Sequence, residues 1–208
     1  MPPRHPGSLL VKQIPVGPMA NFVYLAVDEG TKESMVVDSG WEVGPLVAAV
    51  RDAGAKVKYV VATHGHFDHV STIRELADEV GGQVVAHRSS ALDSDLRVEG
   101  GDELKVGRTT VKILPTPGHT EDSICLYDGK EVFTGDTLFV GTIGKFDRSN
   151  AERIFSSLYD VLGKLPGKTM VYPGHDYGEV PCRTLEEEFR ANPFLGTPDL
   201  RMFLSLFS

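Results

Sequence analysis

The segment THGHFDH, residues 63–69, concentrates four side chains that can bind metal ions: His64, His66, Asp68 and His69. Imidazole and carboxylate groups are the ligands that proteins use for zinc, iron and manganese. Positions i and i+2 of a helix do not face each other, so His64 and His66 are expected to converge on one metal from a loop. The segment follows the apolar run VKYVVA, which predicts a loop between the end of a buried strand and the start of a helix. Asp68 suits such a helix start, where the positive end of the helix dipole lies.

Three further candidate ligands stand in one repeated context, directly after an apolar run and a glycine. His119 occurs in PTPGHT, Asp136 in FTGDTLF and His175 in YPGHDYG. The glycine before each donor permits a tight turn, so each side chain can point from a strand end into a common cleft. We interpret five of the seven histidines as parts of one metal site. His5 lies in a proline-rich start and His87 ends a strand without a glycine turn, and we predict that neither is a ligand.

The elements that must position these residues alternate between strand-rich and helix-rich blocks. Short apolar runs bounded by Gly, Pro and Asp predict strands at 9–16, 21–27, 34–38, 57–62, 83–87, 103–106, 109–115, 122–128, 130–135 and 169–174. Apolar residues at helical spacing predict helices at 42–54, 69–82, 151–165 and 182–192. Because strand-rich blocks open both halves and helices follow, we predict an α/β fold of two packed sheets with helices on their outer faces. No linker divides the sequence, so we expect a single domain over residues 1–208.

Composition excludes several classes of function. The chain of 208 residues carries a net charge of −8 and no basic run longer than two residues, so we expect no nucleic-acid partner. It contains no apolar run of about 18 residues, and we expect no membrane partner. The start MPPRHPGSLLVKQIP has no apolar signal-peptide region, and the two cysteines do not suggest a disulfide framework. A cytoplasmic location is therefore predicted.

The set HGHFDH, GHT, GDTLF and GHDYG, in this order, resembles the metallo-β-lactamase-fold superfamily of hydrolases over nearly the whole chain. The resemblance implies a four-layer αββα sandwich with two divalent metal ions at one edge. Zinc is the expected metal, and iron and manganese are the alternatives. It assigns the first metal to His64, His66 and His119, the second to Asp68, His69 and His175, and a bridging position to Asp136. Asp38, at the end of VVD, resembles an aspartate of the family that supports the histidine loop without binding metal.

This resemblance predicts hydrolytic chemistry. Two divalent ions would lower the pKa of a bridging water and supply hydroxide at neutral pH. Together with two ligand carboxylates and the hydroxide, the cluster would carry a charge of about +1, which favours a small anionic ester or thioester. We expect Asp68 to be catalytic as well, because its carboxylate can orient the nucleophile or manage its proton.

GDTLFVGTIGKFD resembles glyoxalase II, the hydroxyacylglutathione hydrolases, in which a basic residue at the position of Lys145 holds a carboxylate of glutathione. Tyr177 matches a substrate-contacting tyrosine of that group. Two departures are visible: Asp147 lies where a tyrosine is expected, and the C-terminal helical region of the group is missing. We therefore expect a smaller or more open substrate site. The segment PDLRMFLSLFS has helical spacing, and we predict that it packs on its own domain, with a homodimer contact as the alternative.

Two other functions remain open. YPGHDYGEVPCRTLEEEFRANPFL is also similar to the persulfide dioxygenases, in which His64, His119 and Asp136 would bind one iron and leave positions for dioxygen and a persulfide. That group has alanine at the position of Phe67 and Gly-Cys-Gly-Arg where this chain has GTIGK, so the sequence favours a hydrolase. A metal-binding protein without catalysis is the third class, which an open, ligand-rich groove disfavours.

Overall fold

The computed structural model describes residues 9–196 and 199–207. In it, runs of Val, Ile and Leu in the first half of the chain form a six-stranded sheet. Its strands, in spatial order, are β1 (Leu10–Val16), β2 (Asn21–Val27), β3 (Glu33–Val37), β4 (Lys56–Val61), β5 (Gln83–His87) and β6 (Leu96–Val98). The pairs β1–β2 and β2–β3 are antiparallel, and the pairs from β3 to β6 are parallel. The ends of β3, β4 and β5 therefore meet at the same edge of the sheet.

The second half of the chain forms another six-stranded sheet, in the order β14-β13-β10-β9-β8-β7. Its strands are β7 (Glu103–Val106), β8 (Thr109–Pro115), β9 (Ile124–Tyr127), β10 (Glu131–Gly135), β13 (Met170–Pro173) and β14 (Arg183–Thr184). A small hairpin of β11 (Leu138–Phe139) and β12 (Thr142–Ile143) lies beside it. The sequence did not predict β6, β11, β12 or β14, because strands of two or three residues are too short to show a period.

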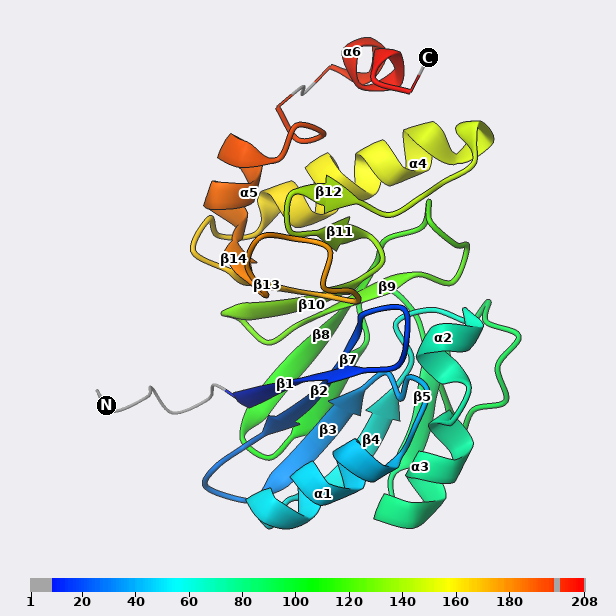
Figure 1. Ribbon diagram of the computed structural model, residues 1–208, viewed down its shortest axis with the longest axis vertical. Coiled ribbons are helices and arrows are strands. Elements are labelled where there is room, and N and C mark those ends of the chain that lie inside the picture. Colours follow the sequence, from blue (N-terminus) through cyan, green and yellow to red (C-terminus); the bar gives the residue numbers. More distant parts are fainter. Residues whose placement is uncertain (1–8, 197–198, 208) are drawn as a thin grey trace.

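Helices cover the outer face of each sheet (Figure 1). They are α1 (Gly44–Ala53), α2 (Phe67–Val70), α3 (Ile73–Val80), α4 (Ala151–Ser156), α5 (Leu185–Ala191) and α6 (Leu200–Ser205). In Figure 1, α1 and α3 lie below the first sheet, and α4 and α5 lie above the second. The helix predicted at 151–165 begins as α4 and continues through a π turn and a 3₁₀ turn to Lys164. The predicted four-layer αββα sandwich, a single domain, is confirmed.

The helix predicted over residues 69–82 is instead two helices, α2 and α3, with a break at Ser71 and Thr72. The Ser71 hydroxyl donates to the Gly40 carbonyl at 2.6 Å, and the Thr72 hydroxyl donates to the same oxygen at 3.2 Å. Hydroxyl side chains that bind backbone outside the helix compete with helix continuation. The break lets α2 stand alone at the sheet edge, with the histidine loop directly before it.

The main core lies between the two sheets, where the inward-facing residues of both interdigitate. Tyr24 of β2 packs edge-on against Phe133 of β10, with ring centroids 5.1 Å apart, and its hydroxyl donates to the Pro173 carbonyl. Met35 and Ile113 are fully buried in the same cluster. Because one continuous core joins both halves, the edges that carry the predicted ligands are held in register with each other.

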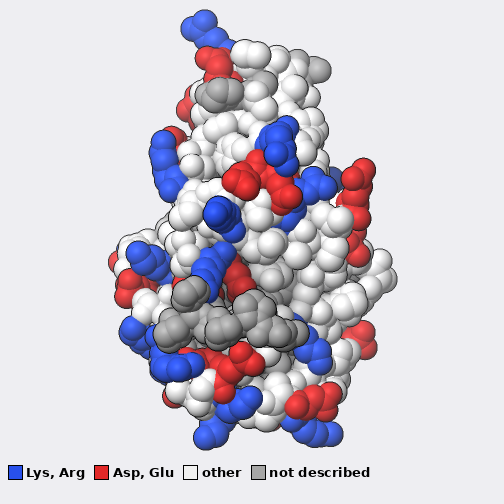
Figure 2. Space-filling model, turned by 90° about the vertical axis from the view of Figure 1, so that its left-hand side faces the viewer, with Lys and Arg blue, Asp and Glu red and all other residues white. Residues whose placement is uncertain are grey.

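The C-terminal helix α6 packs on its own domain, as predicted. Phe203 is fully buried and lies 5.4 Å, ring to ring, from Phe155 of α4. No helix in the described part of the chain is long and apolar enough to cross a membrane. On the face in Figure 2, basic and acidic side chains are interspersed rather than segregated by sign. His5 lies outside the described residues, and so do residues 1–8 of the start on which the predicted lack of a signal peptide rests.

An ion pair joins the two sheets far from the predicted metal site. Asp28, which follows β2, is buried, and Arg108 donates to it from the β7–β8 turn, through its backbone nitrogen at 2.7 Å and its guanidinium at 2.9 Å. The hydrogen bonds from the Arg108 guanidinium have the largest effect on the pKa of Asp28. Together with the Arg108 backbone nitrogen they hold that pKa well below its ordinary value. A carboxylate with a lowered native pKa stabilises the fold above its unfolded pKa of about 3.9, and this stabilisation is lost as the pH falls below that value.

We therefore predict that Asp28→Asn lowers the free energy of unfolding at pH 7 by about 1.5–3 kcal/mol, the range for hydrogen bonds to charged groups. The difference from the wild type should shrink below about pH 4, where the carboxylate of the unfolded chain becomes protonated. Urea unfolding at pH 7 and at pH 3.5 measures both effects. Asp52→Asn, at an exposed position of α1, is the matched control. A difference that is equal at both pH values would contradict this role of the Asp28 charge.

Candidate metal centre

The histidine loop between β4 and α2 is held in place by Asp38, at the end of β3. Asp38 Oδ1 accepts from the Thr63 backbone nitrogen at 2.8 Å, and Asp38 Oδ2 accepts from the Thr63 hydroxyl at 2.9 Å. The same Oδ2 accepts from His69 Nδ1 at 2.8 Å. This buried carboxylate therefore fixes both ends of the loop. Its geometry agrees with the supporting role predicted for Asp38.

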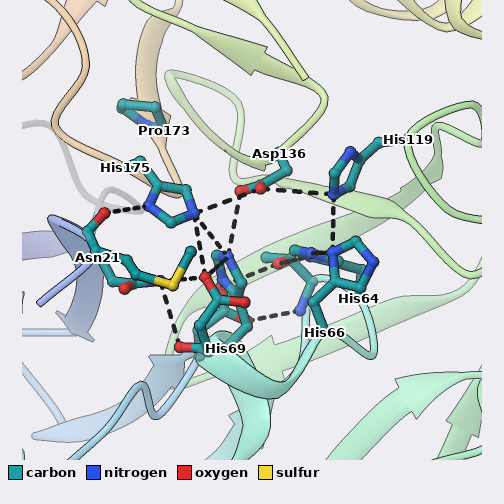
Figure 3. Close-up of polar contacts among 12 residues, drawn as sticks. Asn21, His64, His66, His69, His119, Asp136, Pro173 and His175 are labelled. Carbon is teal, nitrogen blue, oxygen red and sulfur yellow. Dashed lines mark hydrogen bonds and ion pairs between the residues drawn. The ribbon is translucent and has the colours of Figure 1, made fainter. Parts of the chain in front are cut away.

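Three histidine nitrogens converge beside this loop, and we call them the first cluster: His64, His66 and His119 (Figure 3). His66 Nδ1 lies 3.0 Å from His64 Nε2 and 3.0 Å from His119 Nε2. His119 comes from the loop after β8, where Gly118 has a φ of 144° and a Cβ would approach the backbone of Ile154 within 2.6 Å. Only glycine permits this turn, which brings His119 against the loop from the first sheet.

Asp68, His69 and His175 form the second cluster. In Figure 3, Asp136 lies between His175 and His119, that is, between the two clusters. His175 Nε2 lies 3.2 Å from His69 Nε2 and 3.3 Å from Asp68 Oδ2. Asp136 Oδ2 lies 3.5 Å from His119 Nε2 and 3.4 Å from His175 Nε2. The structure thus brings together all seven predicted ligands, and Asp136 reaches both clusters, as its predicted bridging position requires.

Hydrogen bonds on the far side of three imidazoles, those of His69, His175 and His119, direct the Nε2 atom of each ring inward. His69 Nδ1 donates to Asp38, His175 Nδ1 donates to the Met19 carbonyl at 2.9 Å, and His119 Nδ1 donates to the Lys145 carbonyl at 2.6 Å. In a neutral imidazole the other nitrogen is then an acceptor. His69 Nε2 and His175 Nε2 lie 3.2 Å apart. Burial lowers the pKa of both rings, but the neighbouring carboxylates outweigh it and raise both pKa values, so the surroundings of this nitrogen pair favour a positive charge, a proton or a metal ion. The donor set therefore fits metal ions.

Burial and the neighbouring charges have opposite effects on the pKa values of these donors. Asp136 Oδ1 is buried and has no hydrogen-bond partner among the described residues, as expected of an oxygen reserved for a metal. Burial alone would raise the pKa of Asp136, but His175 and His69 outweigh it and hold the pKa well below its ordinary value. Burial lowers the pKa of His64 and of His119, so both rings stay neutral. Neutral imidazole and ionised carboxylate are the forms that bind metal.

Sequence reasoning missed Asn21, the first residue of β2. Its Nδ2 donates to Asp68 Oδ2 at 2.9 Å, and its Oδ1 accepts from Trp41 Nε1 at 2.8 Å. Asn21 is 1% exposed, so this amide fixes the Asp68 carboxylate from a different strand. An asparagine that opens an otherwise apolar strand is the one signal in the sequence that could have indicated it.

The two predicted substrate contacts lie in different places. Lys145 lines a cavity of about 710 Å³ beside the first cluster, and its carbonyl binds His119. Tyr177 stacks on the His175 ring at 4.7 Å and is 53% exposed. It lines a smaller neighbouring cavity rather than the one beside His119. The structure therefore brings Lys145 and Tyr177 to two sides of the centre.

The family model of the Metallo-beta-lactamase superfamily matches residues 16–92 and 79–175. The chain belongs to this superfamily. With its clustered donors, it is a metal-dependent enzyme of the metallo-beta-lactamase fold.

Individual relatives extend the comparison. The human mitochondrial persulfide dioxygenase ETHE1 is 32% identical, over 90% of this chain and 76% of its own length. The crystal structure of ETHE1 from Myxococcus xanthus is 34% identical with a TM-score of 0.88, covering 95% of this chain and 89% of its own. A di-iron-bound form of the protein TTHA1623 is 30% identical with a TM-score of 0.75, covering 89% of this chain and 100% of its own.

His64→Ala should remove at least one metal equivalent per chain and abolish turnover, because it deletes one of three converging nitrogens. Elemental analysis of the purified, untagged variant measures the metal, and circular dichroism confirms the fold. His87→Ala is the control: His87 ends β5 and its Nδ1 contacts the Ser89 hydroxyl at 2.8 Å. Full metal content in the His64 variant, or metal loss in the His87 variant, would refute the ligand assignment.

Asp38→Asn should weaken metal affinity about 10–100-fold, the usual effect of losing a group that orients a ligand. An amide nitrogen in place of Oδ2 can no longer accept from His69 or Thr63. Competition with a chelator such as EDTA measures the change, and Asp93→Asn, at an exposed position, is the control. An unchanged chelator midpoint would show that His69 needs no such support.

Proposed function

We propose that this protein is a persulfide dioxygenase with one iron bound by His64, His119 and Asp136. The observation that carries the proposal is the similarity to persulfide dioxygenases over nine-tenths of the chain, at 32% identity. The sequence alone favoured a hydrolase, and the comparisons favour its alternative. Iron at a site of two histidines and one carboxylate keeps open positions for dioxygen and a persulfide.

Two departures from the dioxygenases are compatible with this proposal. Phe67 is 68% exposed and packs edge-on against Trp41 at 5.7 Å, so it enlarges the apolar rim at the surface. In GTIGK, the Lys145 carbonyl accepts from His119 Nδ1 at 2.6 Å, so the backbone of this segment orients a ligand whatever its side chains are. His66 Nδ1 lies 3.0 Å from His64 Nε2 and 3.0 Å from His119 Nε2, directly beside the two histidines of the proposed iron site.

The reaction balances without a further co-reactant. A persulfide R–S–SH, dioxygen and water become the thiol R–SH, sulfite and two protons. The sulfur–sulfur bond breaks, the outer sulfur is oxidised and dioxygen is reduced. Ferrous iron, when bound, would supply the dioxygen site and the electrons that activate it. The chain's own contribution is to orient three ligand imidazoles and to fix their tautomer, because Asp38, Met19 and Lys145 each accept the Nδ1 hydrogen of one ring.

A metal-dependent hydrolase of a small ester or thioester is the second candidate. The second cluster is a complete donor set of its own, and the similar protein TTHA1623 has been crystallised in a di-iron-bound form. Two metals would then be bridged by Asp136, with Asp68 beside the nucleophile, as the sequence predicted. A small-molecule substrate is part of both candidates, and a cytoplasmic location and a possible homodimer stay predictions.

Metal stoichiometry combined with substrate turnover separates the candidates. We expect close to one iron per chain in the purified, untagged protein, and oxygen uptake in an electrode cell when glutathione persulfide or benzyl persulfide is added. His119→Ala should reduce oxygen uptake at least 100-fold, because it removes one of the two histidines of the iron site. His87→Ala, outside both clusters, should retain it. Close to two zinc ions per chain, thioester hydrolysis and no oxygen uptake would overturn the proposal in favour of the hydrolase.

A further inference from the structure

A largely apolar cavity of about 710 Å³ opens directly beside the first cluster, a volume typical of small-molecule sites. His66 and His119 lie on one side of it. Its other walls are Ile143, Phe146, Phe194 and Phe207. A substrate whose sulfur reaches the first cluster would therefore place the rest of its structure against these apolar side chains.

The charges in this cavity cancel. Lys145 and Asp147 are its two charged lining residues among those the structure describes, and both are exposed. Glutathione carries two carboxylates and one ammonium at neutral pH. One lysine offset by an aspartate is a poor match for those groups, since each charge that leaves water without a partner costs binding free energy. The apolar walls favour a different kind of substituent.

A buried polar network holds the two walls together. Glu188 is fully buried, and its carboxylate accepts from the Gly141 backbone at 3.0 Å and from Asn192 Nδ2 at 2.9 Å. Asn192 Nδ2 also donates to the Thr142 carbonyl at 3.1 Å, and Asn192 Oδ1 accepts from the Phe194 backbone at 3.0 Å. The β11–β12 hairpin and the Phe194 wall are thus joined before any ligand arrives, which reduces the ordering cost of binding.

The C-terminal segment completes the cavity. Phe207 follows α6, and its ring lies 4.8 Å from Phe146 and stacks on Phe194 at 5.5 Å. It is 40% exposed, so part of the ring is available to a ligand. Phe203, one turn earlier, is fully buried beneath Phe146 and Phe207 and anchors the helix. The aromatic wall is therefore built by a segment that packs on its own domain.

Resting on the proposed dioxygenase function, we propose that the persulfide carries an apolar aryl or branched alkyl group on its inner sulfur, and that glutathione is not its preferred carrier. The apolar group would lie among Ile143, Phe146 and Phe207, with the persulfide sulfur directed at the first cluster. Lys145 then acts through its carbonyl on His119, rather than as a carboxylate anchor.

Binding of two inert thioethers tests the substrate class without any turnover. Isothermal titration of the iron-loaded protein under argon should give benzyl methyl sulfide at least ten-fold tighter binding than S-methylglutathione. Phe207→Ala should weaken benzyl methyl sulfide about ten-fold, as truncating a buried aromatic contact does. Leu206→Ala is the matched control, because Leu206 is 43% exposed on the same segment and does not line the cavity.

Equal or tighter binding of S-methylglutathione by the wild type would overturn the inference whether or not the variants fold. So would a loss of S-methylglutathione binding in Lys145→Ala greater than ten-fold, since that assigns the lysine to a carboxylate. Oxygen uptake is scored separately, as kcat/KM for benzyl persulfide against glutathione persulfide, with at least a ten-fold preference expected for the former. Selective binding of benzyl methyl sulfide without oxygen uptake from either persulfide would refute the dioxygenase function. It would still support the inference that this cavity binds an apolar substituent.

Discussion

Two imidazole nitrogens that face each other across the centre impose the main constraint on this structure. His69 Nε2 and His175 Nε2 lie 3.2 Å apart, and each ring donates its other N–H to a fixed acceptor, Asp38 or the Met19 carbonyl. Neither ring can turn away without breaking that hydrogen bond. The surroundings of this nitrogen pair favour a positive charge, so the hydrogen bonds that organise the fold at this edge also favour metal binding.

The acceptors that fix the rings come from different elements. Asp38 ends β3, Met19 lies in the β1–β2 turn and Lys145 follows the β11–β12 hairpin. The two sheets share one core, so these positions cannot shift independently. Close packing is tight here: a Cβ on Gly174 would lie 2.4 Å from Asp136 Oδ1. The centre is therefore pre-organised by the sandwich and not by the loops alone.

The same donor set serves two kinds of chemistry, which explains why sequence and comparisons favoured different enzymes. Seven ligands suffice for two metals and hydroxide, while three of them suffice for one iron with open positions. The residue types at the two clusters do not decide how many ions bind. The wall of Phe146, Phe194 and Phe207 lies beside the first cluster. In our proposal it selects which substrate binds next to the metal, and it does not determine which reaction the metal performs.

The amino-acid sequence by itself determined two packed sheets with outer helices and the seven candidate ligands, because strand periodicity and glycine-flanked donors are local signals. The four-layer αββα order and the support from Asp38 came from the family resemblance of its motifs. The sequence could not reveal the Asn21 amide on Asp68, the Lys145 carbonyl on His119, or the break that separates α2 from α3. It also could not foresee that Phe194 and Phe207 would meet Phe146 beside the first cluster. Each of these depends on contacts between residues far apart in the chain, and only the packing of the two sheets brings such residues together.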